Sequence, residues 1–227
     1  MDSDLPGRIK ENLKFFWREN RQFFFLLCCI VFFKSAIGDI SSISGASMQP
    51  TLLDGDKVWL NKLAYDIKIP FTEISLASIA DPKRGDIVVF DSKKAKKRLV
   101  KRIVGLPGDT ILLQKNNLII NGQAVNYEIV TEDQNSMIII EELPERSHKA
   151  QLSRNYISLS NRNYGPVDVP PDQYFVLGDN RDNSSDSRRY SFIPRGELIG
   201  RSSSVIFSLD PANRYMPRAD RFFSGLD

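Results

Sequence analysis

The sequence predicts a mostly β protein that carries one apolar helix near its N-terminus. Short apolar runs of four to six residues recur along the chain, for example at 57–60, 86–90 and 173–177. Turn residues separate them, such as Asp-Gly-Asp at 54–56 and Pro-Gly-Asp at 107–109. Runs this short, bounded by turns, are typical of antiparallel strands. Before them, eleven apolar residues run unbroken from Phe23 to Phe33.

Length and composition fit a globular protein of one large or two modest domains. The chain has 227 residues, of which 41% are hydrophobic and 26% charged. Its net charge of +3 is small, and the only dense basic stretch is Lys93–Lys101, so nucleic-acid binding is not indicated. The two cysteines, Cys28 and Cys29, lie inside the apolar run, and His148 is the only histidine. We therefore expect no disulfide framework, no metal site and no cofactor.

The apolar run is the first element, and it has three possible interpretations. Eleven residues are fewer than the roughly 20 that a membrane-spanning helix needs. The run could belong to a transmembrane anchor over 22–38 with Lys34 reaching the interface, to a signal peptide removed after Gly38, or to a buried helix of a soluble protein. We favour the anchor. Basic residues precede the run and none occurs between Lys34 and Lys57, so the positive-inside rule places 1–21 in the cytoplasm and exports 39–227.

The strands follow in order. An alternating or apolar pattern and flanking turns predict strands at 57–60, 86–90, 99–104, 110–113, 117–120, 173–177 and 204–207. The strands at 110–113 and 117–120 are separated by Gln-Lys-Asn and form a hairpin. Residues 126–170 are polar and irregular, and we expect them to form an inserted lobe.

Ser47 is a candidate nucleophile, because it lies in the segment 44–52 only 14 positions after Phe33. At about 3.3–3.6 Å per residue it lies within about 50 Å of the apolar run, so its reaction would take place near a membrane. A serine needs a base. Lys101 lies in an apolar strand, where alternation would place it with Ile103 on one face; burial would lower its pKa and make the neutral amine a general base. From the residues alone, an exposed lysine beside an exposed Arg102 is the more ordinary interpretation.

The segment 178–188 is densely polar and directly follows an apolar strand. Its Asp and Asn residues allow a solvated loop or a calcium loop, but Arg181, Arg188 and Arg189 disfavour calcium. Interleaved Asp and Arg are more typical of an internal ion-pair network, with Asp186 and Arg188 close enough to pair across a turn.

These segments together resemble the signature motifs of bacterial type I signal peptidases, which are membrane-bound serine proteases with a Ser–Lys dyad. The motifs are Ser-Met-Gln-Pro-Thr-Leu at 47–52, Arg-Gly-Asp-Ile-Val-Val-Phe at 84–90, Lys-Arg-Ile-Val-Gly-Leu-Pro-Gly-Asp at 101–109 and the segment 178–188, in this order. The similar stretches run from about residue 34 to 207 and are weak over 126–170. The resemblance implies an antiparallel β catalytic domain of coiled or barrel-like sheets behind one transmembrane helix.

The resemblance also implies roles for individual residues. Ser47 would be the nucleophile, its backbone N–H an oxyanion donor, and Lys101 the general base, held by the hydroxyl of Ser184. Asp179, Asp186 and Arg188 would brace the loop that carries Ser184. A substrate would bind extended near Ile43 and Val100. Met48, Leu52 and Val100 would line one shallow pocket, and Ile43, Val58, Val89 and Val100 another.

Three positions depart from the family pattern. Gly45 stands where many members have a serine whose hydroxyl completes the oxyanion hole. Ser44 replaces the usual proline before that site, and Gln49 follows Met48. These departures leave the second oxyanion donor unassigned.

The resemblance implies removal of signal peptides from exported preproteins at the outer face of the bacterial cytoplasmic membrane, through an acyl-enzyme. The expected partners are preprotein signal peptides and the lipid bilayer, and we expect a monomer. His148→Ala should leave activity unchanged. Two alternatives stay open: a specialised Ser–Lys peptidase for a single secretion or conjugation substrate, and a catalytically inactive, membrane-anchored binding domain.

Overall fold

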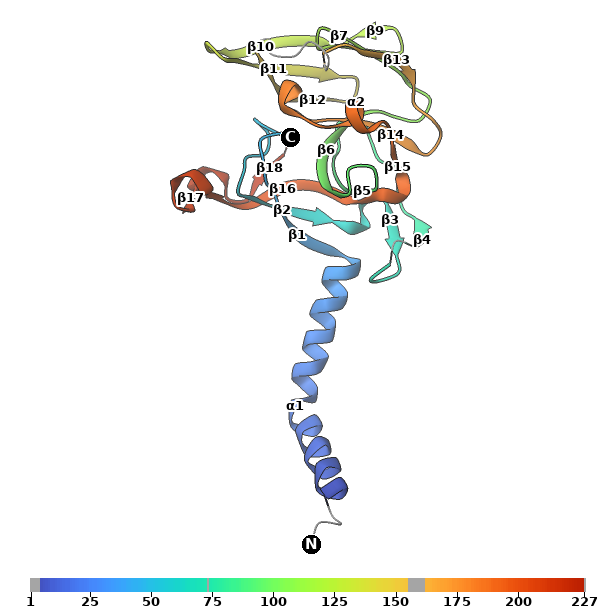
Figure 1. Cartoon of the computed structure of the whole chain (residues 1–227), viewed down its shortest axis with the longest axis vertical. Coiled ribbons are helices and arrows are strands. Elements are labelled where there is room, and N and C mark those ends of the chain that lie inside the picture. Colours follow the sequence, from blue (N-terminus) through green and yellow to red (C-terminus); the bar gives the residue numbers. More distant parts are fainter. Residues whose placement is uncertain (1–4, 73, 155–161, 227) are drawn as a thin grey trace.

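The computed structural model describes residues 5–72, 74–154 and 162–226, and it consists of one long helix and a β domain (Figure 1). The helix, α1 (Leu5–Ala36), projects away from the β domain. It carries the predicted apolar run, whose side chains are widely exposed: Phe23 by 62%, Phe25 by 72% and Ile30 by 48%. In the part of the chain that the structure describes, no helix meets the combination of length and apolar character required for crossing a membrane. The assignment of 22–38 as a transmembrane anchor therefore stays a prediction.

The largest sheet contains nine strands, all joined by antiparallel pairing. Its path runs β1 (Gly38–Ser42), β2 (Asp56–Asn61), β16 (Leu198–Asp210), β5 (Ile87–Ser92), β6 (Lys97–Gly105), β14 (Gln173–Leu177) and β15 (Ile193–Pro194). Two short strands, β17 (Met216–Pro217) and β18 (Ser224–Gly225), pair with β16. β6 lies between β5 and β14, and its C-terminal half, from Lys101 to Gly105, is buried.

Three smaller sheets complete the domain. One contains β10 (Asn126–Glu132), β11 (Ser136–Leu143) and β12 (Arg146–Ser153); a second contains β13 (Tyr164–Asp168), β7 (Thr110–Gln114), β8 (Asn117–Ile120) and β9 (Gln123–Ala124); a third pairs β3 (Asp66–Lys68) with β4 (Ser75–Ser78). The predicted mostly β, antiparallel fold class is confirmed. Over the described residues, the strand order of the main sheet begins at β1 and ends at β15, so the sheet does not close into a barrel.

The prediction that 126–170 is irregular is wrong for most of its length, while its assignment as an inserted lobe stays a prediction. β10, β11 and β12 form a regular sheet, and β13 joins β7. The reason lies in the buried positions of this sheet. Glu141 and His148 are paired across β11 and β12, with exposed fractions of 0% and 4%. Charged and polar residues stand where the strand pattern expects apolar ones, so the segment looks solvated in sequence. Residues 155–161 of this range lie outside the described residues.

An apolar cluster supports the segment that carries Ser47. Met48 and Leu52 follow Ser47 and are buried to 1% and 0% exposure, where they pack with Val58 and Val205. Leu52 N–H donates to Met48 C=O at 2.9 Å, which closes one turn of chain over this cluster. The burial of these side chains fixes where the backbone of Ser47 lies.

Candidate active site

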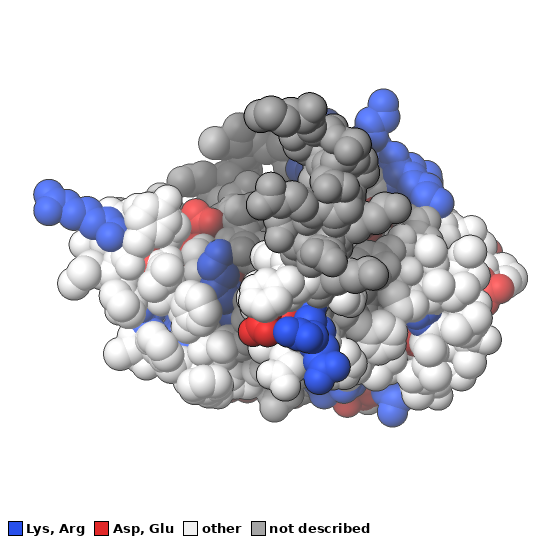
Figure 2. All heavy atoms as spheres, turned by 90° about the horizontal axis from the view of Figure 1, so that it is seen from below, with Lys and Arg blue, Asp and Glu red and all other residues white. Residues whose placement is uncertain are grey.

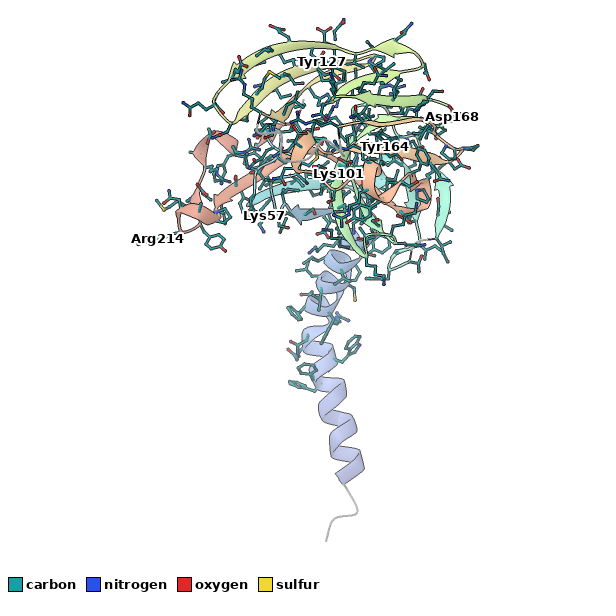
Figure 3. The ribbon with its side chains drawn as sticks, turned by 45° about the horizontal axis from the view of Figure 1, so that its top comes forward. Lys57, Lys101, Tyr127, Tyr164, Asp168 and Arg214 are labelled. Atoms are coloured by element: carbon teal, nitrogen blue, oxygen red, sulfur yellow. The ribbon has the colours of Figure 1, made fainter. Side chains whose placement is uncertain are left out.

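Lys101 lies near the middle of the β domain (Figure 3), and its amine contacts the hydroxyl of Ser47. Lys101 Nζ is 2.6 Å from Ser47 Oγ and also donates to Val100 C=O at 2.8 Å. Lys101 is 2% exposed and Arg102 is 1% exposed. The interpretation of Lys101 as an exposed strand lysine is therefore wrong. The turn that carries Ser47 covers the Lys101 amine, and Asp179 covers the neighbouring Arg102.

The environment of Lys101 favours its neutral form. Burial lowers the pKa of the Lys101 amine from 10.5 to about 8, although the carboxylates of Asp186 and Asp179 act in the opposite direction. At pH 7 roughly one amine in ten is then neutral, since each pH unit below a pKa changes this ratio tenfold. The neutral Nζ has a lone pair that accepts the hydrogen bond of the Ser47 hydroxyl. The pair can therefore do what a nucleophile and its general base do.

Ser47 lies in a turn, and the residues that precede it in this turn border open space. Over the described residues, no hydrogen-bond acceptor is found for the Ser47 N–H. Gly45 donates its N–H to Asp54 Oδ1 at 3.1 Å, and a Cβ added at Gly45 would meet no atom within 4 Å. The Gly45 position thus leaves an empty space beside the nucleophile. Within the described part of the chain, the Ser47 N–H is a backbone donor without an acceptor at this turn.

Ser184 is close to the nucleophile, but the predicted contact with Lys101 is not formed. A Cβ added at Gly178 would lie 2.2 Å from Ser184 Oγ and 2.4 Å from Ser47 C=O, so these two residues approach the same glycine. Ser184 Oγ is buried and forms no hydrogen bond of good geometry with a described residue, although it lies near enough to the Asp186 carboxyl to help lower its pKa. The Nζ of Lys101 instead contacts Ser47 and Val100. The role of Ser184 stays a prediction.

Asp186 and Arg188 form the predicted ion pair. Arg188 Nε and Nη2 donate to the two Asp186 oxygens at 2.8 Å each, and Asp186 also accepts from Gly178 N–H at 3.0 Å. Burial alone would raise the pKa of Asp186, but these hydrogen bonds and the Arg188 charge hold it below its usual range. A second contact from Arg188 reaches Arg181 C=O at 2.6 Å. The pair thus fixes both ends of the loop 178–188.

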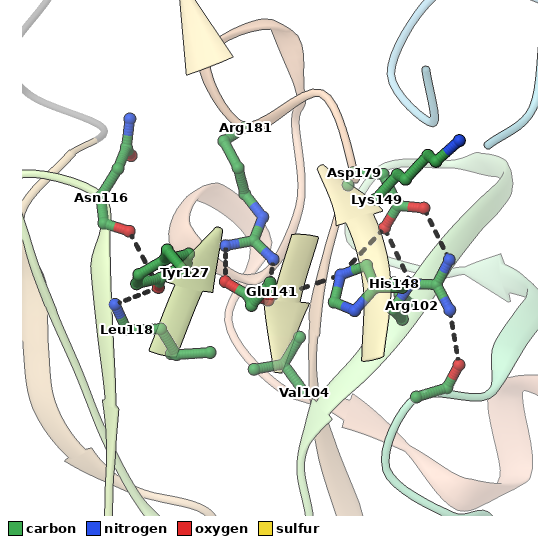
Figure 4. A network of polar contacts seen from close by, with 12 residues as sticks. Arg102, Val104, Asn116, Leu118, Tyr127, Glu141, His148, Lys149, Asp179 and Arg181 are labelled. Carbon is green, nitrogen blue, oxygen red and sulfur yellow. Dashed lines mark hydrogen bonds and ion pairs between the residues drawn. The ribbon is translucent and has the colours of Figure 1, made fainter. Parts of the chain in front are cut away.

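Asp179 belongs to a buried network that the sequence did not predict in full (Figure 4). It binds Arg102 through two hydrogen bonds of 2.9 and 2.7 Å, and both side chains are 1% exposed. Removing one partner of such a pair typically costs about 3–5 kcal/mol. Arg181, which follows Asp179 and Asn180, forms a second bidentate pair with Glu141 of β11.

His148 lies between these two ion pairs. Its Nε2 is 3.4 Å from Glu141 Oε2 and 3.7 Å from Asp179 Oδ1. Burial, followed by the nearby Arg102 charge, lowers the pKa of His148 from 6.5 to about 4, so the ring is neutral at pH 7. The interleaved Asp and Arg residues of 178–188 predicted an internal ion-pair network that includes Arg181. Its partner Glu141 was missed, because it lies in the segment 126–170, where no regular element was expected.

A groove of about 210 Å³ lies beside the Ser47–Lys101 contact. Three of the predicted substrate-binding residues line it: Ile43, Met48 and Val100. The other three, Leu52, Val58 and Val89, are 0% exposed and are not among its lining residues. Leu52 and Val58 pack instead into the apolar cluster that also contains Met48. The remaining lining residues are Ser41, Ser42, Ser44, Gly45, Ser47, Arg98, Leu99 and Lys101.

Two strand edges lie beside this groove. β1 pairs only with β2, and residues 97–101 of β6 pair only with β5, because β14 reaches β6 only from Arg102 onward. Their other backbone edges are therefore open to an added strand within the described structure. An extended peptide can bind such edges through main-chain hydrogen bonds.

Comparisons with known proteins agree on one family. The family model described as "Signal peptidase, peptidase S26" matches residues 17–207. Signal peptidase I of Pseudomonas aeruginosa is 32% identical over 220 residues, which cover 88% of this chain and 76% of that protein. Signal peptidase I P of Bacillus subtilis subsp. natto is 35% identical over 169 residues, which cover 74% and 76% respectively. A crystal structure of a signal peptidase I from Enterococcus faecalis, 30% identical, covers 55% of this chain and 98% of its own, at a TM-score of 0.35. On the family match and the two sequence relatives, the chain belongs to the signal peptidase family, peptidase S26.

Proposed function

We propose that Ser47 and Lys101 are the catalytic dyad with which this chain, a peptidase of the signal peptidase family, removes signal peptides from exported preproteins. The observation that carries this proposal is the 2.6 Å contact between Ser47 Oγ and a lysine amine that is 2% exposed. A buried, partly neutral amine in contact with a half-buried hydroxyl is the arrangement that a Ser–Lys peptidase requires. Membership of the family supports the same assignment.

The reaction proceeds in two steps. In the first, Ser47 Oγ attacks the scissile carbonyl carbon while its proton passes to the neutral Nζ of Lys101. The protonated amine then gives this proton to the leaving nitrogen, the peptide bond breaks, and the signal peptide remains as an ester on Ser47. In the second step Lys101 takes a proton from a water molecule that attacks the ester, and the proton returns to Ser47 Oγ as the acid product leaves.

The negative charge on the substrate oxygen needs a donor during both steps. The Ser47 N–H is proposed for this role, because it has no acceptor among the described residues and belongs to the nucleophile itself. One such donor typically contributes about 3–4 kcal/mol to lowering the barrier. Gly45 offers no side-chain donor, so a second one would have to come from elsewhere.

The substrate is proposed to bind as an extended strand between the open edges of β1 and β6. Val100 and Lys101 of β6 line the groove together with Ile43 and Ser47, which follow β1. Its volume of about 210 Å³ suits small side chains next to the scissile bond. Met48 and Val100 would contact the residue that precedes the cleavage site, and Ile43 the residue two positions earlier.

The α1 helix is proposed to hold the enzyme at the cytoplasmic membrane, with residues 1–21 in the cytoplasm and the β domain on the outer side. Its apolar side chains are exposed rather than packed on the domain, and contact with lipid would remove them from water. Lys and Arg side chains are visible at several places on the face from which the helix emerges, where they would meet anionic headgroups (Figure 2). We propose that the enzyme acts as a monomer.

Cleavage of a model preprotein by the purified full-length chain tests the dyad. Ser47→Ala and Lys101→Ala should each lower processing by about 10⁴-fold or more, since dyad members act as a unit. Ser147→Ala and Lys149→Ala are matched controls, because both residues are exposed on β12, and they should process normally. Normal processing by either dyad variant would refute the assignment. A wild-type chain that binds preproteins without cleaving them would instead support the inactive binding domain.

A further inference from the structure

Asn180 contacts the backbone on both sides of the proposed nucleophile. Its side-chain Nδ2 donates to Ala46 C=O at 3.1 Å, and its backbone N–H donates to Ser47 C=O at 3.1 Å. Asn180 is 6% exposed, so these bonds are shielded from water. Two consecutive peptide groups, 46–47 and 47–48, are thereby tied to one residue of a different segment.

The first of these bonds has a consequence for the oxyanion donor. The peptide bond between Ala46 and Ser47 is trans, since the cis bonds of the described chain lie at Gln49–Pro50 and Gly165–Pro166. In a planar trans peptide the C=O and the N–H point in opposite directions. A donor that holds Ala46 C=O on one side therefore directs the Ser47 N–H to the other side. That N–H has no acceptor among the described residues.

We propose that Asn180 is a positioning residue for the oxyanion hole: its amide fixes the Ala46–Ser47 peptide plane so that the Ser47 N–H points at the substrate oxygen. This role rests on the proposed nucleophile, Ser47. It gives a reason why one backbone donor can serve where Gly45 provides no hydroxyl. A donor that is already oriented before the reaction needs no reorganisation free energy when negative charge develops on the substrate oxygen.

Ala46 C=O has a second partner, and it does not replace Asn180. Gln49 N–H donates to the same oxygen at 3.1 Å, but Gln49 lies in the same turn and moves with it. Asn180 is the contact from outside the turn. The close approach of Gly178 to Ser47 C=O places the whole segment 178–180 against the nucleophile, so the turn and this segment keep a fixed relation.

The residues on either side of Asn180 are themselves held by other elements. Asp179 is paired with Arg102 of β6, and Arg181 with Glu141 of β11 (Figure 4). Gln151 of β12 donates its N–H to Asp179 C=O at 2.7 Å and forms a bridge with Asn180. The sheet of β10, β11 and β12 is thus connected to Ser47 through Asn180, and it supports the geometry of the oxyanion hole without lining the groove.

The test compares Asn180→Asp and Asn180→Ser in the full-length chain, with Asn183→Asp as the matched control. Asn183 lies in the same segment and is exposed, so its substitution adds the same charge without removing a contact to the nucleophile turn. Four quantities are measured: kcat and KM for a preprotein, the pH profile of kcat/KM, the affinity for a peptide aldehyde that forms a tetrahedral adduct with a serine, and the affinity for the unreactive product peptide.

We expect both Asn180 variants to lower kcat by about 10- to 100-fold with KM nearly unchanged, somewhat less than the loss of a complete oxyanion donor. Aldehyde affinity should fall by a similar factor, whereas product affinity should not change. The apparent pKa near 8 should stay in Asn180→Ser, whereas the added carboxylate of Asn180→Asp should raise it, because it stands close to the Ser47–Lys101 pair. Asn183→Asp should behave as wild type. The proposal is overturned if kcat is retained, if aldehyde and product affinity fall together, or if the loss in the neutral Asn180→Ser variant disappears at high pH, which would reveal a shifted Lys101 pKa.

Two further measurements separate the possible causes of a loss. Thermal unfolding of each variant shows whether a loss of kcat is due to a loss of folded protein. If Asn180→Asp does not fold, the measurements on Asn180→Ser decide the test. Ser47→Ala is run in parallel. If Ser47→Ala still cleaves, the proposed nucleophile is wrong whatever the Asn180 variants do. If it does not cleave while the Asn180 variants are fully active, only the positioning role fails.

Discussion

At the scale of single residues, the proposed dyad makes the ionisation of Lys101 set the pH at which Ser47 can react. Burial lowers the pKa of this amine to about 8, and only the neutral form accepts the serine proton. We therefore expect kcat/KM to rise about tenfold per pH unit below pH 8 and to level off above it. A series of initial rates from pH 6 to 10 measures this profile. A flat profile across pH 7 to 9 would mean that another group is the base.

The same reasoning makes arginine an unsuitable replacement for Lys101. A guanidinium stays charged at any pH that proteins tolerate, and its planar fork is larger than an ammonium. Lys101→Arg should be as inactive as Lys101→Ala and should not recover at high pH. Rates at pH 7 and pH 10, together with a thermal melt to confirm folding, provide the comparison. Recovery of activity at pH 10 would argue against proton transfer through residue 101.

Gly178 is required by the close approach of two segments. A Cβ at this position would lie 2.4 Å from the backbone oxygen of Ser47, and a backbone atom cannot turn aside as a side chain can. Gly178→Ala should cost about 1–3 kcal/mol of stability, as overpacking does elsewhere, and should lower kcat by displacing Ser47. Gly196→Ala is the control, because its Cβ would meet no atom within 4 Å. The free energy of unfolding, from chemical denaturation, and kcat are measured for both variants. Equal values in Gly178→Ala and Gly196→Ala would contradict the packing argument.

At the scale of elements, β12 places a histidine against β11 and the loop after β14, and this position makes the fold acid-sensitive. His148 faces Glu141, Asp179, Arg102 and Arg181. Its folded-state pKa of about 4 lies below the unfolded value of 6.5, so between these pH values the unfolded chain binds more protons. The contribution of His148 to the free energy of unfolding is therefore fully present above pH 6.5. It is lost as the pH drops to 4, which lowers the free energy of unfolding by up to about 3 kcal/mol.

Replacement of His148 by a residue that does not titrate isolates this contribution. His148→Asn should lose less stability than wild type between pH 6.5 and pH 4, and its activity at pH 8 should stay within about twofold, since His148 does not reach the dyad. Urea denaturation at several pH values measures the difference. Identical pH dependence in both proteins would show that the carboxylates alone cause the acid sensitivity.

The same elements show which part of the structure the sequence could predict. Strands such as 86–90 and 110–113 carry apolar residues in regular runs, and the structure places β5 and β7 there. β11 and β12 were missed because Glu141 and His148 occupy buried positions, and their burial depends on partners far along the chain. Ser47 and Lys101 were found through the motifs that surround them. The contact of Asn180 with Ala46 joins residues 134 positions apart, and no local pattern encodes it.

At the scale of the whole molecule, the proposed anchor makes the relation between α1 and the β domain determine where cleavage takes place. Ile37 N–H donates to Phe33 C=O at 2.9 Å, and β1 begins at Gly38, so the helix continues almost directly into the sheet that carries the site. Lys62 Nζ donates to Lys34 C=O at 2.6 Å and Phe71 N–H donates to Ser35 Oγ at 2.7 Å. These contacts fasten the end of the helix to the domain, so a membrane that holds the helix also limits the distance of Ser47 from its surface.

The attachment of α1 to lipid is open to a direct test. Wild-type protein should stay with the membranes after alkaline carbonate extraction. An apolar run of eleven residues gives only a small favourable free energy of membrane insertion. A central Asp typically costs about 2.5–3.5 kcal/mol on insertion. Ile30→Asp should therefore move much of the protein to the soluble fraction. Ile129→Asp is the control, because Ile129 is also exposed, by 58%, but lies on β10 at the other end of the domain (Figure 1). Release of the wild-type chain by carbonate would refute the anchor and leave the dyad unaffected. Retention of wild type and of Ile129→Asp, with release of Ile30→Asp, would identify the run at 23–33 as the segment that holds this peptidase at the membrane.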